Sequence, residues 1–426
     1  MAEIFAHNVA RLWESLGGSA LVSSYALPSP LLAWRTRQHK AALGIMLTAS
    51  HNPPQYLGIK LKEHYGGSAT SETQAEVARL ASSLEPPDID FEPRYLHGAL
   101  FNPVEHYSDS IASAFRGVDS RTDKRPSPRI VVDFMNGVAA NIAPDIFSAR
   151  GIDAEYLRTE RDPTFGGVGP EPVQARLGEL SRRTASLGGR VIGMAFDGDG
   201  DRLTAMDETG DCLGSHELYT IFLEHLVRIR GAQGRAVGSF SFSTIVDKAA
   251  QKLGVEMTRV PVGYKAVAEE FLKGDVMIGG EESGGTGFGF WLPERDALAM
   301  ALMLCEAVSI AGKPLSEMRR DLARSYGDYA FQSRNIRLSK APRYDELDLA
   351  IAKANHYLGA RRIERIDSLD GRKLWLEGGA WVLIRRSGTE PLVRIYTESG
   401  DSEQTRQLLD ETEAFVRRVA DRNQMA

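Results

Sequence analysis

One unit recurs three times along the chain, and it limits the fold more than any other feature of the sequence. In each copy a short strand-like segment is followed by a turn, a helical segment and a second strand. The copies cover 19–47, 129–157 and 235–260. Strand–helix–strand crossovers of this kind build mostly parallel sheets. The pattern predicts three similar α/β domains, and the irregular spacing of the copies excludes a solenoid of short repeats.

Breaks in the composition divide the chain into domains. The 426 residues predict about three domains at roughly 150 residues each. Breaks without helical or strand periodicity lie at 117–128, 207–214 and 326–329. After the last break the sequence predicts short strands with one helix before them and one after, which is typical of a separate, smaller α+β domain. The expected domains are 1–116, 117–212, 213–326 and 327–426.

The charge balance and the cysteine count narrow the functional class. Lys and Arg number 51 and Asp and Glu number 57, a net charge of −6, which argues against a dedicated nucleic-acid-binding protein. Cys212 and Cys305 cannot form a disulfide framework, so a reducing compartment is expected. The N-terminal residues lack the pattern of a signal peptide, and the apolar run 297–311 is shorter than a membrane span. We therefore expect a cytoplasmic protein with no nucleic-acid or membrane partner.

The first segment that carries chemistry is Thr-Ala-Ser-His-Asn-Pro at 48–53, directly after the apolar strand predicted at 42–47. A polar loop after such a strand places Ser50 at the carboxyl edge of a sheet, where open α/β folds bind ligands. A plain turn is the alternative, because Ser, Asn and Pro all favour turns. Ser50 and His51 are not a convincing hydrolase pair, since the nucleophile-elbow pattern is absent.

The second segment is Asp-Gly-Asp-Gly-Asp-Arg at 197–202, after the apolar strand predicted at 191–195. Carboxylates at alternate positions, with only glycine between them, can converge on one cation, and oxygen ligands select Mg²⁺ or Ca²⁺. An EF-hand is excluded because Arg202 stands at the sixth position, where that loop requires glycine. Arg202 is instead suited to a phosphate oxygen. A solvated acidic turn is the alternative.

Two further glycine-containing turns complete the set. At 279–285 the backbone can approach a ligand closely, while Glu281 and Ser283 offer the groups that hydrogen bond to sugar hydroxyls. At 385–391, arginine, hydroxyls and glycine N–H groups in one turn resemble an anion-binding nest, with Arg394 close behind. The alternatives are an ordinary acidic turn and an exposed basic turn. Together the four segments meet the needs of phosphoryl transfer between an enzyme and a sugar phosphate.

In this order the motifs TASHNP, DGDGDR, GGEESGG and RxSGTEP resemble those of the α-D-phosphohexomutase family, the phosphoglucomutases and phosphomannomutases. The resemblance covers nearly the whole chain from Leu21 onward. Supporting matches lie at 57–60, 162–165, 261–265 and 293–296. The resemblance implies three related mixed α/β domains and a smaller C-terminal α+β domain around a central cleft.

The resemblance also implies roles for individual residues. Ser50 would carry the phosphoryl group that passes to a hexose phosphate and returns from a bisphosphate intermediate. The implied catalytic residues are Ser50, His51, Lys60 and Arg202. The implied Mg²⁺ ligands are Ser50, Asp197, Asp199 and Asp201. The implied substrate-binding residues are Lys265, Glu281, Ser283, Arg295, Arg385, Ser387, Gly388, Thr389 and Arg394. Glucose 1,6-bisphosphate is the expected activator, and a monomer or homodimer is the expected assembly.

GGEESGG followed by PERD resembles the phosphoglucomutase branch, so we expect interconversion of glucose 1-phosphate and glucose 6-phosphate, with mannose phosphates as the second choice. The chain departs from the family pattern in three places. Leu57 stands where the family usually has Asn, and Trp291 stands where phosphoglucomutase-like members often have His. The family's opening segment, with its Gly-Thr-Ser-Gly-type loop, has no counterpart in this sequence.

Two other functions stay open at this point. The absent opening segment favours a catalytically impaired relative that binds sugar phosphates without turning them over. A metal-dependent serine hydrolase or phosphatase is the third hypothesis, and it is the weakest because no separate water-activating motif is present.

Overall fold

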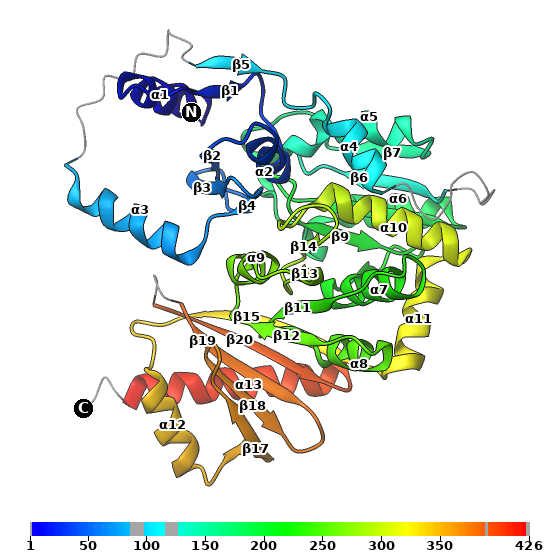
Figure 1. The fold of residues 1–426 in the computed structure, drawn as a ribbon. Helices are drawn as coiled ribbons and strands as arrows, with labels where there is room; N and C mark the ends of the chain where they lie inside the picture. Colours follow the sequence, from blue (N-terminus) through cyan, green and yellow to red (C-terminus); the bar gives the residue numbers. More distant parts are fainter. Residues whose placement is uncertain (1, 86–97, 116–126, 388–390, 423–426) are drawn as a thin grey trace. The chain divides into compact units, whose positions relative to one another are not determined.

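The computed structural model describes residues 2–85, 98–115, 127–387 and 391–422 (Figure 1). The chain forms two compact units. The first unit consists of Met1–Gly238, Ala250–Thr258 and Gly263–Arg319. The second unit consists of Ser239–Ala249, Arg259–Val262 and Arg320–Ala426.

The N-terminal part of the first unit alternates helices with short strands. Its elements are α1 (Ala2–Ser15), β1 (Leu21–Ser23), α2 (Ser29–Gln38), β2 (Leu43–Thr48), β3 (Gly58–Glu63), β4 (Gly67–Ser68), α3 (Ser71–Ser83), β5 (Ala99–Phe101) and α4 (Tyr107–Ala114). β1 pairs in parallel with β5, while β2 pairs antiparallel with β3, and β3 antiparallel with β4. The parallel crossover predicted for 19–47 is wrong for the described residues, because β1 and β2 lie in different sheets and β2 pairs only with the antiparallel β3.

The next part of the chain follows the prediction for 129–157 closely. Its elements are β6 (Arg129–Asp133), η1 (Val138–Asn141), α5 (Ala143–Ala149), β7 (Ala154–Leu157), η2 (Phe165–Gly167), η3 (Gln174–Arg176), α6 (Gly178–Leu187), β8 (Val191–Phe196), β9 (Leu203–Met206) and β10 (Cys212–Leu213). The sheet order is β10-β9-β8-β6-β7, with β6 parallel to both β7 and β8. Every residue of β8 is buried, as expected for an apolar strand at the centre of a sheet.

A third sheet, with order β12-β11-β13-β14, follows. Its region contains α7 (Ser215–Arg228), β11 (Arg235–Ser239), α8 (Thr244–Leu253), β12 (Met257–Val260), α9 (Tyr264–Leu272), β13 (Val276–Gly280), β14 (Thr286–Phe288), α10 (Ala297–Ala311) and α11 (Leu315–Tyr326). The carboxylate of Asp296 caps α10 by accepting from the backbone nitrogens of Leu298 and Ala299, at 3.0 and 3.1 Å. Gly312, with φ of 67°, ends this buried helix.

The C-terminal part of the second unit is built on one sheet with the order β15-β20-β19-β18-β17-β16. Its elements are β15 (Ala330–Arg337), α12 (Tyr344–Lys353), β16 (Tyr357–Leu358), β17 (Arg361–Asp367), β18 (Arg372–Leu376), β19 (Trp381–Arg386), β20 (Leu392–Ser399) and α13 (Ser402–Arg422). The prediction of one helix before the strands is wrong, because α12 follows β15. The sequence also failed to predict β17, whose alternating charged residues resemble an exposed segment.

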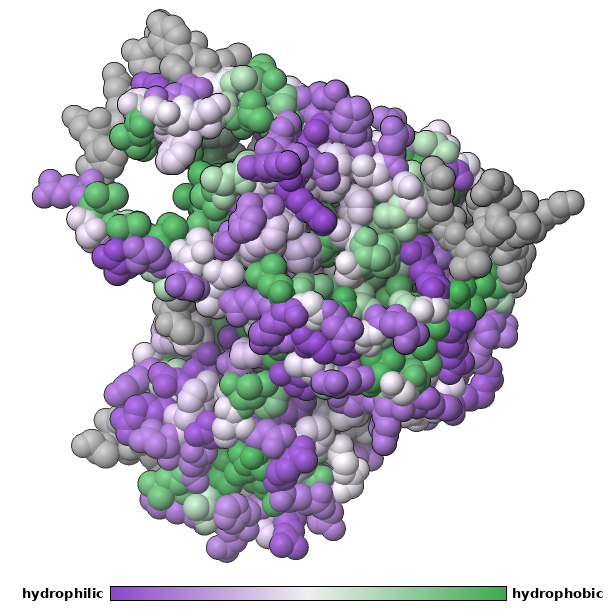
Figure 2. Space-filling view, viewed as in Figure 1, coloured by the Kyte–Doolittle hydropathy of each residue, from purple (hydrophilic) through white to green (hydrophobic). Residues whose placement is uncertain are grey.

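The fold class is confirmed: three related α/β domains precede a different C-terminal domain. The expected boundaries stay predictions, and most of the linker expected at 117–128 lies outside the described residues. The central cleft also stays a prediction. Figure 2 shows hydrophobic side chains exposed over α3, a helix with no buried residue. Among the described residues no single helix meets the length and hydropathy of a membrane span, although α10 and α11 meet them together across an 83° bend.

Candidate active site

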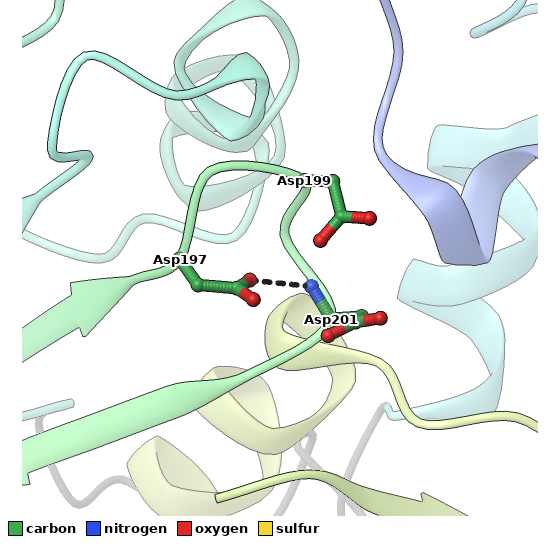
Figure 3. A group of neighbouring side chains, drawn as sticks. All are labelled: Asp197, Asp199 and Asp201. Carbon is green, nitrogen blue, oxygen red and sulfur yellow. Dashed lines mark hydrogen bonds between the residues drawn. The ribbon is translucent and has the colours of Figure 1, made fainter. Parts of the chain in front are cut away.

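The three aspartates of the DGDGDR motif lie in the turn between β8 and β9. The carboxylates of Asp197, Asp199 and Asp201 are buried, and one oxygen of each lies within 4.8 Å of one oxygen of the others (Figure 3). The carboxylate of Asp197 accepts from the backbone nitrogens of Asp201 and Arg202, at 2.9 and 3.1 Å. These bonds fix the turn, so the alternating spacing predicted from sequence does bring the three carboxylates together.

The donor set of this turn fits a hard divalent cation. Asp197 Oδ2 and Asp201 Oδ1 are buried and have no hydrogen-bond partner among the described residues. Burial and the neighbouring Asp201 and Asp199 raise the pKa of Asp197 well above its usual value. A cation would relieve that repulsion, and ligands that are oxygen alone select Mg²⁺ or Ca²⁺. Asp197, Asp199 and Asp201 could therefore hold Mg²⁺.

Ser50 lies against this acidic turn. Its hydroxyl donates to Asp199 Oδ1 at 3.0 Å, and its backbone nitrogen donates to Thr48 Oγ1 at 2.8 Å. Ser50 has φ of 54°, a left-handed conformation that costs a non-glycine residue about 1–2 kcal/mol and is typical of functional turns. A Cβ at Gly198 would lie 2.7 Å from the Ser50 carbonyl oxygen, so only glycine allows the two loops to approach this closely. The plain-turn alternative therefore does not explain the contacts of Ser50.

Lys60 on β3 connects the serine to the acidic turn. Its Nζ donates to Asp199 Oδ2 at 2.7 Å, to Asp201 Oδ2 at 2.8 Å and to Ser50 Oγ at 3.3 Å. Burial opposes the charge of the ammonium, but Asp201 and Asp199 outweigh it and raise the pKa of Lys60 above its ordinary value. Lys60 is therefore protonated at neutral pH in this arrangement.

Three further basic groups surround the same turn. Arg202 and Arg295, both largely buried, lie near Asp201: Arg202 Nε is 3.8 Å from Oδ1 and Arg295 Nε is 2.9 Å from Oδ2. Burial disfavours the ionised form of Asp201, but Arg295, Lys60 and Arg202 hold its pKa well below the usual range. Burial, Arg202 and Arg295 lower the pKa of His51 to about 3, so this imidazole is neutral.

The glycine-rich turn after β13 faces the same group. Ser283 Oγ donates to Glu281 Oε1 at 2.6 Å, and Arg295 Nη1 lies 3.2 Å from Glu281 Oε2. The guanidinium of Arg295 also lies 5.4 Å from the centre of the Tyr264 ring. Arg295 therefore joins the predicted sugar-binding turn to the acidic turn.

The remaining predicted residues make contacts within their own parts of the chain. Lys265 is the second residue of α9, which follows the loop at 261–263. Arg385 on β19 donates to Asp370 Oδ2 at 2.7 Å, and the backbone nitrogen of Ser387 donates to Leu392 at 2.8 Å. Arg394 on β20 is exposed and is the register partner of Arg385. Gly388 and Thr389 lie outside the described residues.

Family models match the chain in the order of its four domains. The matches are to the phosphoglucomutase/phosphomannomutase alpha/beta/alpha domains I, II and III and the C-terminal domain, over residues 1–87, 105–210, 214–326 and 335–414. The chain belongs to the α-D-phosphohexomutase family. The predicted resemblance is thereby confirmed at the level of the family.

Named relatives of this phosphohexomutase differ in substrate. A phosphoglucomutase/phosphomannomutase from Thermococcus kodakarensis is 30% identical over 390 residues, 90% of this chain and 80% of that protein. A phosphoglucosamine mutase from Methanocaldococcus jannaschii is 29% identical over 405 residues, 92% of this chain and 84% of that protein.

Solved structures of the family share the fold. A crystal structure from Thermus thermophilus, provisionally described as a phosphomannomutase, superposes with a TM-score of 0.80 at 33% identity, covering 98% of this chain and 87% of that one. The N-acetylphosphoglucosamine mutase of Aspergillus fumigatus, solved with GlcNAc-6P and magnesium, has a TM-score of 0.61 at 16% identity, covering 99% and 98%. A variant of the same fungal enzyme was solved with glucose 1,6-bisphosphate.

One residue near the site of this phosphohexomutase was not selected from the sequence. Thr48 Oγ1 accepts from the backbone nitrogen of Ser50 and donates to Asp199 Oδ2 at 3.3 Å. The position of Thr48 in the TASHNP motif was the signal that could have identified it. Trp291, which departs from the family pattern, is buried, and its indole nitrogen donates to Asp296 Oδ2 at 2.9 Å. Its effect on substrate contacts stays a prediction.

Proposed function

We propose that this phosphohexomutase interconverts glucose 1-phosphate and glucose 6-phosphate through a phosphorylated Ser50 and a glucose 1,6-bisphosphate intermediate. The observation that carries the proposal is the position of the Ser50 hydroxyl, 3.0 Å from Asp199 and 3.3 Å from Lys60 at a buried triad of aspartates. A nucleophile, a cation-binding turn and a protonated lysine are the parts that phosphoryl transfer requires.

The transfer can be written with its atoms balanced. The free hydroxyl of the sugar phosphate attacks the phosphorus on Ser50, the bond from that phosphorus to Oγ breaks, and a sugar bisphosphate forms. Oγ takes a proton from Lys60, and the proton that the attacking hydroxyl releases restores the ammonium, so Lys60 ends the step protonated as it began. The bisphosphate then reorients in the site, so that its other phosphoryl group faces Ser50. That group returns to Oγ by the reverse reaction. The cycle leaves the enzyme phosphorylated and the phosphate on the other carbon.

Lys60 and the arginines supply positive charge to the reacting phosphoryl group. The Lys60 ammonium already contacts Ser50 Oγ, so it is placed to neutralise phosphoryl oxygens and to give Oγ a proton as it leaves. Arg202 would contact a phosphoryl oxygen beside the same turn. When bound by Asp197, Asp199, Asp201 and Ser50, Mg²⁺ would withdraw charge from the transferring group. With a pKa of about 3, His51 is a weak base, so we assign it no proton transfer.

The other predicted residues hold the substrate in this proposal. Glu281 and Ser283 would hydrogen bond to sugar hydroxyls in both orientations of the bisphosphate. Lys265 would contact substrate oxygens, while the phosphate that is not reacting would bind the turn of Arg385, Ser387, Gly388 and Thr389 with Arg394. Arg385 is preorganised for this role by Asp370, which fixes its Nε at 2.7 Å.

Three hexose phosphates are candidates for the substrate. GGEESGG with PERD favours glucose phosphates, and mannose phosphates are the second choice from sequence. The name of the Methanocaldococcus jannaschii relative, a phosphoglucosamine mutase, favours glucosamine phosphates as a further candidate. The three substrates differ only at the second carbon, so contacts to that carbon decide among them.

An assay with purified protein, Mg²⁺ and a trace of glucose 1,6-bisphosphate tests the function. Conversion of glucose 1-phosphate to glucose 6-phosphate, faster than conversion of the mannose and glucosamine phosphates, is the expected result. Absence of conversion with all three sugars contradicts a mutase and favours a binding protein. Release of inorganic phosphate instead favours a phosphatase.

A further inference from the structure

A second lysine on β3 lies close to the site but does not reach the serine. Lys62 Nζ lies 2.6 Å from Glu294 Oε2, and both side chains are only 1% exposed. Ser68 Oγ donates to the same carboxylate oxygen at 2.6 Å. The contact joins two segments that are 232 residues apart in the sequence, and it is fully shielded from water.

A gain in folding stability does not explain why this ion pair is buried. Removing both charges from water is costly, and well-packed apolar side chains in their place are often as stable or more stable. Buried ion pairs are best explained where they fix a register between two segments. The two segments joined here both carry predicted active-site residues. A fixed register between the segments would hold these residues at a fixed distance from one another.

The first segment is β3, and its lysines share one face. Side chains two residues apart on a strand point to the same side, so Lys60 and Lys62 project together. Lys60 reaches Asp199 and Asp201, while Lys62 reaches Glu294. The strand therefore ties Glu294 to the position of Lys60.

The second segment is the loop before α10, where Glu294 directly precedes Arg295. The other oxygen of Glu294, Oε1, accepts from the backbone nitrogen of Arg295 at 3.2 Å. The Arg295 side chain then reaches Asp201 Oδ2, with Nε at 2.9 Å, and Lys60 Nζ lies 2.8 Å from that same oxygen. Two cations thus meet on one carboxylate oxygen, and Lys62 with Glu294 connects the segments from which they come.

We propose that Lys62 and Glu294 are a positioning pair that sets Arg295 against Asp201 at a fixed distance from Lys60. The proposal rests on the mutase function for its kinetic consequence. Lys62 and Glu294 act through Arg295 and need not touch the substrate. Without the pair, Arg295 is still present, but its guanidinium is no longer held against the Asp201 carboxylate.

A double-mutant cycle between Glu294→Gln and Arg295→Ala tests this route of action. Loss of a residue that orients a site residue typically lowers activity by about tenfold to hundredfold, so we expect Glu294→Gln to lower kcat by at least about tenfold. If Glu294 acts through Arg295, the double variant is no slower than Arg295→Ala alone, within about twofold, because interacting residues are non-additive. Losses that multiply in the double variant overturn the proposal.

Glu294→Gln leaves Lys62 charged and unpaired, which can prevent folding. The variant Lys62→Met with Glu294→Leu removes both charges together and keeps the site testable. We expect it to fold and to show the same loss of kcat as Glu294→Gln. A folded protein with unchanged kcat overturns the proposal. The matched control is Arg230→Met with Glu306→Leu, which removes a largely buried ion pair elsewhere. The Glu306 carboxylate contacts Arg230 and His225, neither of which is a predicted site residue. The kcat of this control should stay within about twofold of the parental value.

Binding of Mn²⁺, measured by calorimetry, separates this proposal from the mutase function. Arg295 competes for Asp201 Oδ2, so Arg295→Ala and Glu294→Gln should both tighten Mn²⁺ binding, by the same factor and not additively. Unchanged Mn²⁺ affinity in Glu294→Gln, beside a shift in Arg295→Ala, overturns the positioning role. A parent protein that is inactive on every hexose phosphate contradicts the proposed function but leaves this comparison intact.

Discussion

The hydroxyl of Ser50 donates a 3.0 Å hydrogen bond to Asp199, a residue 149 positions further along the chain. The bond joins a loop after β2 to the turn between β8 and β9. Lys60 lies within hydrogen-bond distance of both side chains. A candidate nucleophile, a candidate metal ligand and a cation therefore meet at one point, and the predictions below test what each contributes.

Gly198 sets how closely the serine approaches the acidic turn. In Gly198→Ala the new Cβ would lie 2.7 Å from the Ser50 carbonyl oxygen and 2.9 Å from Pro170 Cβ, so the serine loop must move. A displacement of about 1 Å at a reacting group can cost roughly a hundredfold in rate. We expect kcat to fall by at least about tenfold in a steady-state assay.

The matched control for this substitution is Gly178→Ala at the start of α6, where a Cβ meets nothing within 4 Å. It should keep the parental kcat and unfold at the same temperature or slightly higher. Parental activity in Gly198→Ala would show that the close approach of the two loops is unimportant.

The aspartate triad should account for metal affinity. Asp197→Asn removes one negative charge from the turn, and Asp197 Oδ2 has no hydrogen-bond partner among the described residues. We expect the dissociation constant for Mg²⁺, measured by calorimetry, to rise by at least about tenfold. Asp153→Asn is the control, since Asp153 is 72% exposed and pairs with Arg129 away from the triad. Equal affinities in the two variants would mean that the metal binds elsewhere.

Arg385 should matter for a phosphate-bearing substrate. A charge-assisted hydrogen bond is worth about 1.5–3 kcal/mol, so Arg385→Ala should lower kcat/KM by about tenfold to a hundredfold. Asp370→Asn should cause a smaller loss of the same kind, because Asp370 holds Arg385 Nε at 2.7 Å. Arg417→Ala, on the exposed face of α13, is the control and should change nothing. Parental kcat/KM in Arg385→Ala would remove Arg385 from the phosphate site.

Lys373 should give the second unit a pH-dependent stability. It is 3% exposed, its Nζ donates to the Phe240 carbonyl at 3.0 Å, and Nζ lies 3.7 Å from the centre of the Trp381 ring. Burial, with a contribution from Arg259, lowers the pKa of Lys373 from 10.5 to about 7. Between these values the unfolded chain binds more protons than the folded one, so stability rises with pH from about 7 to 10.

The measurement is urea unfolding followed by tryptophan fluorescence at several pH values, with Lys373→Met as the reference. The stability of the parent relative to this variant should increase by up to about 1.4 kcal/mol per pH unit across that window. Below pH 7 the difference should be constant, because the lysine is then charged in both states. Parallel profiles from pH 7 to 10 would exclude an uncharged Lys373.

The sequence was most informative where function depends on neighbouring residues. Asp197, Asp199 and Asp201 could be predicted as a cluster because their spacing is local and glycine lets the turn close. The contact of Ser50 with Asp199 could not be derived from spacing, and only the resemblance to a family placed the two at one site. The contact depends on β2 and β8 ending in the same region, which is a property of the tertiary fold.

One sequence-based expectation failed and one buried contact was not predicted, each for a physical reason. The repeated strand–helix–strand pattern predicted a parallel pairing for β2, but β3 returns after a short loop and pairs with it antiparallel. The roles of Lys62 and Glu294 were not predicted because nothing in either segment identifies its partner. Charged residues on a strand or in a loop are usually exposed, and only the packed structure shows that this pair is buried.

The most direct test of the account is to follow one phosphoryl group on Ser50. The protein is phosphorylated with labelled glucose 1,6-bisphosphate and Mg²⁺, mapped by peptide mass spectrometry, and then mixed with unlabelled glucose 1-phosphate. We expect one phosphate, on the peptide that contains Ser50, and transfer of the label to sugar bisphosphate. Ser50→Ala should take up no label, while Ser82→Ala on exposed α3 should behave as the parent. Label on another residue, or its release as inorganic phosphate, would contradict the account.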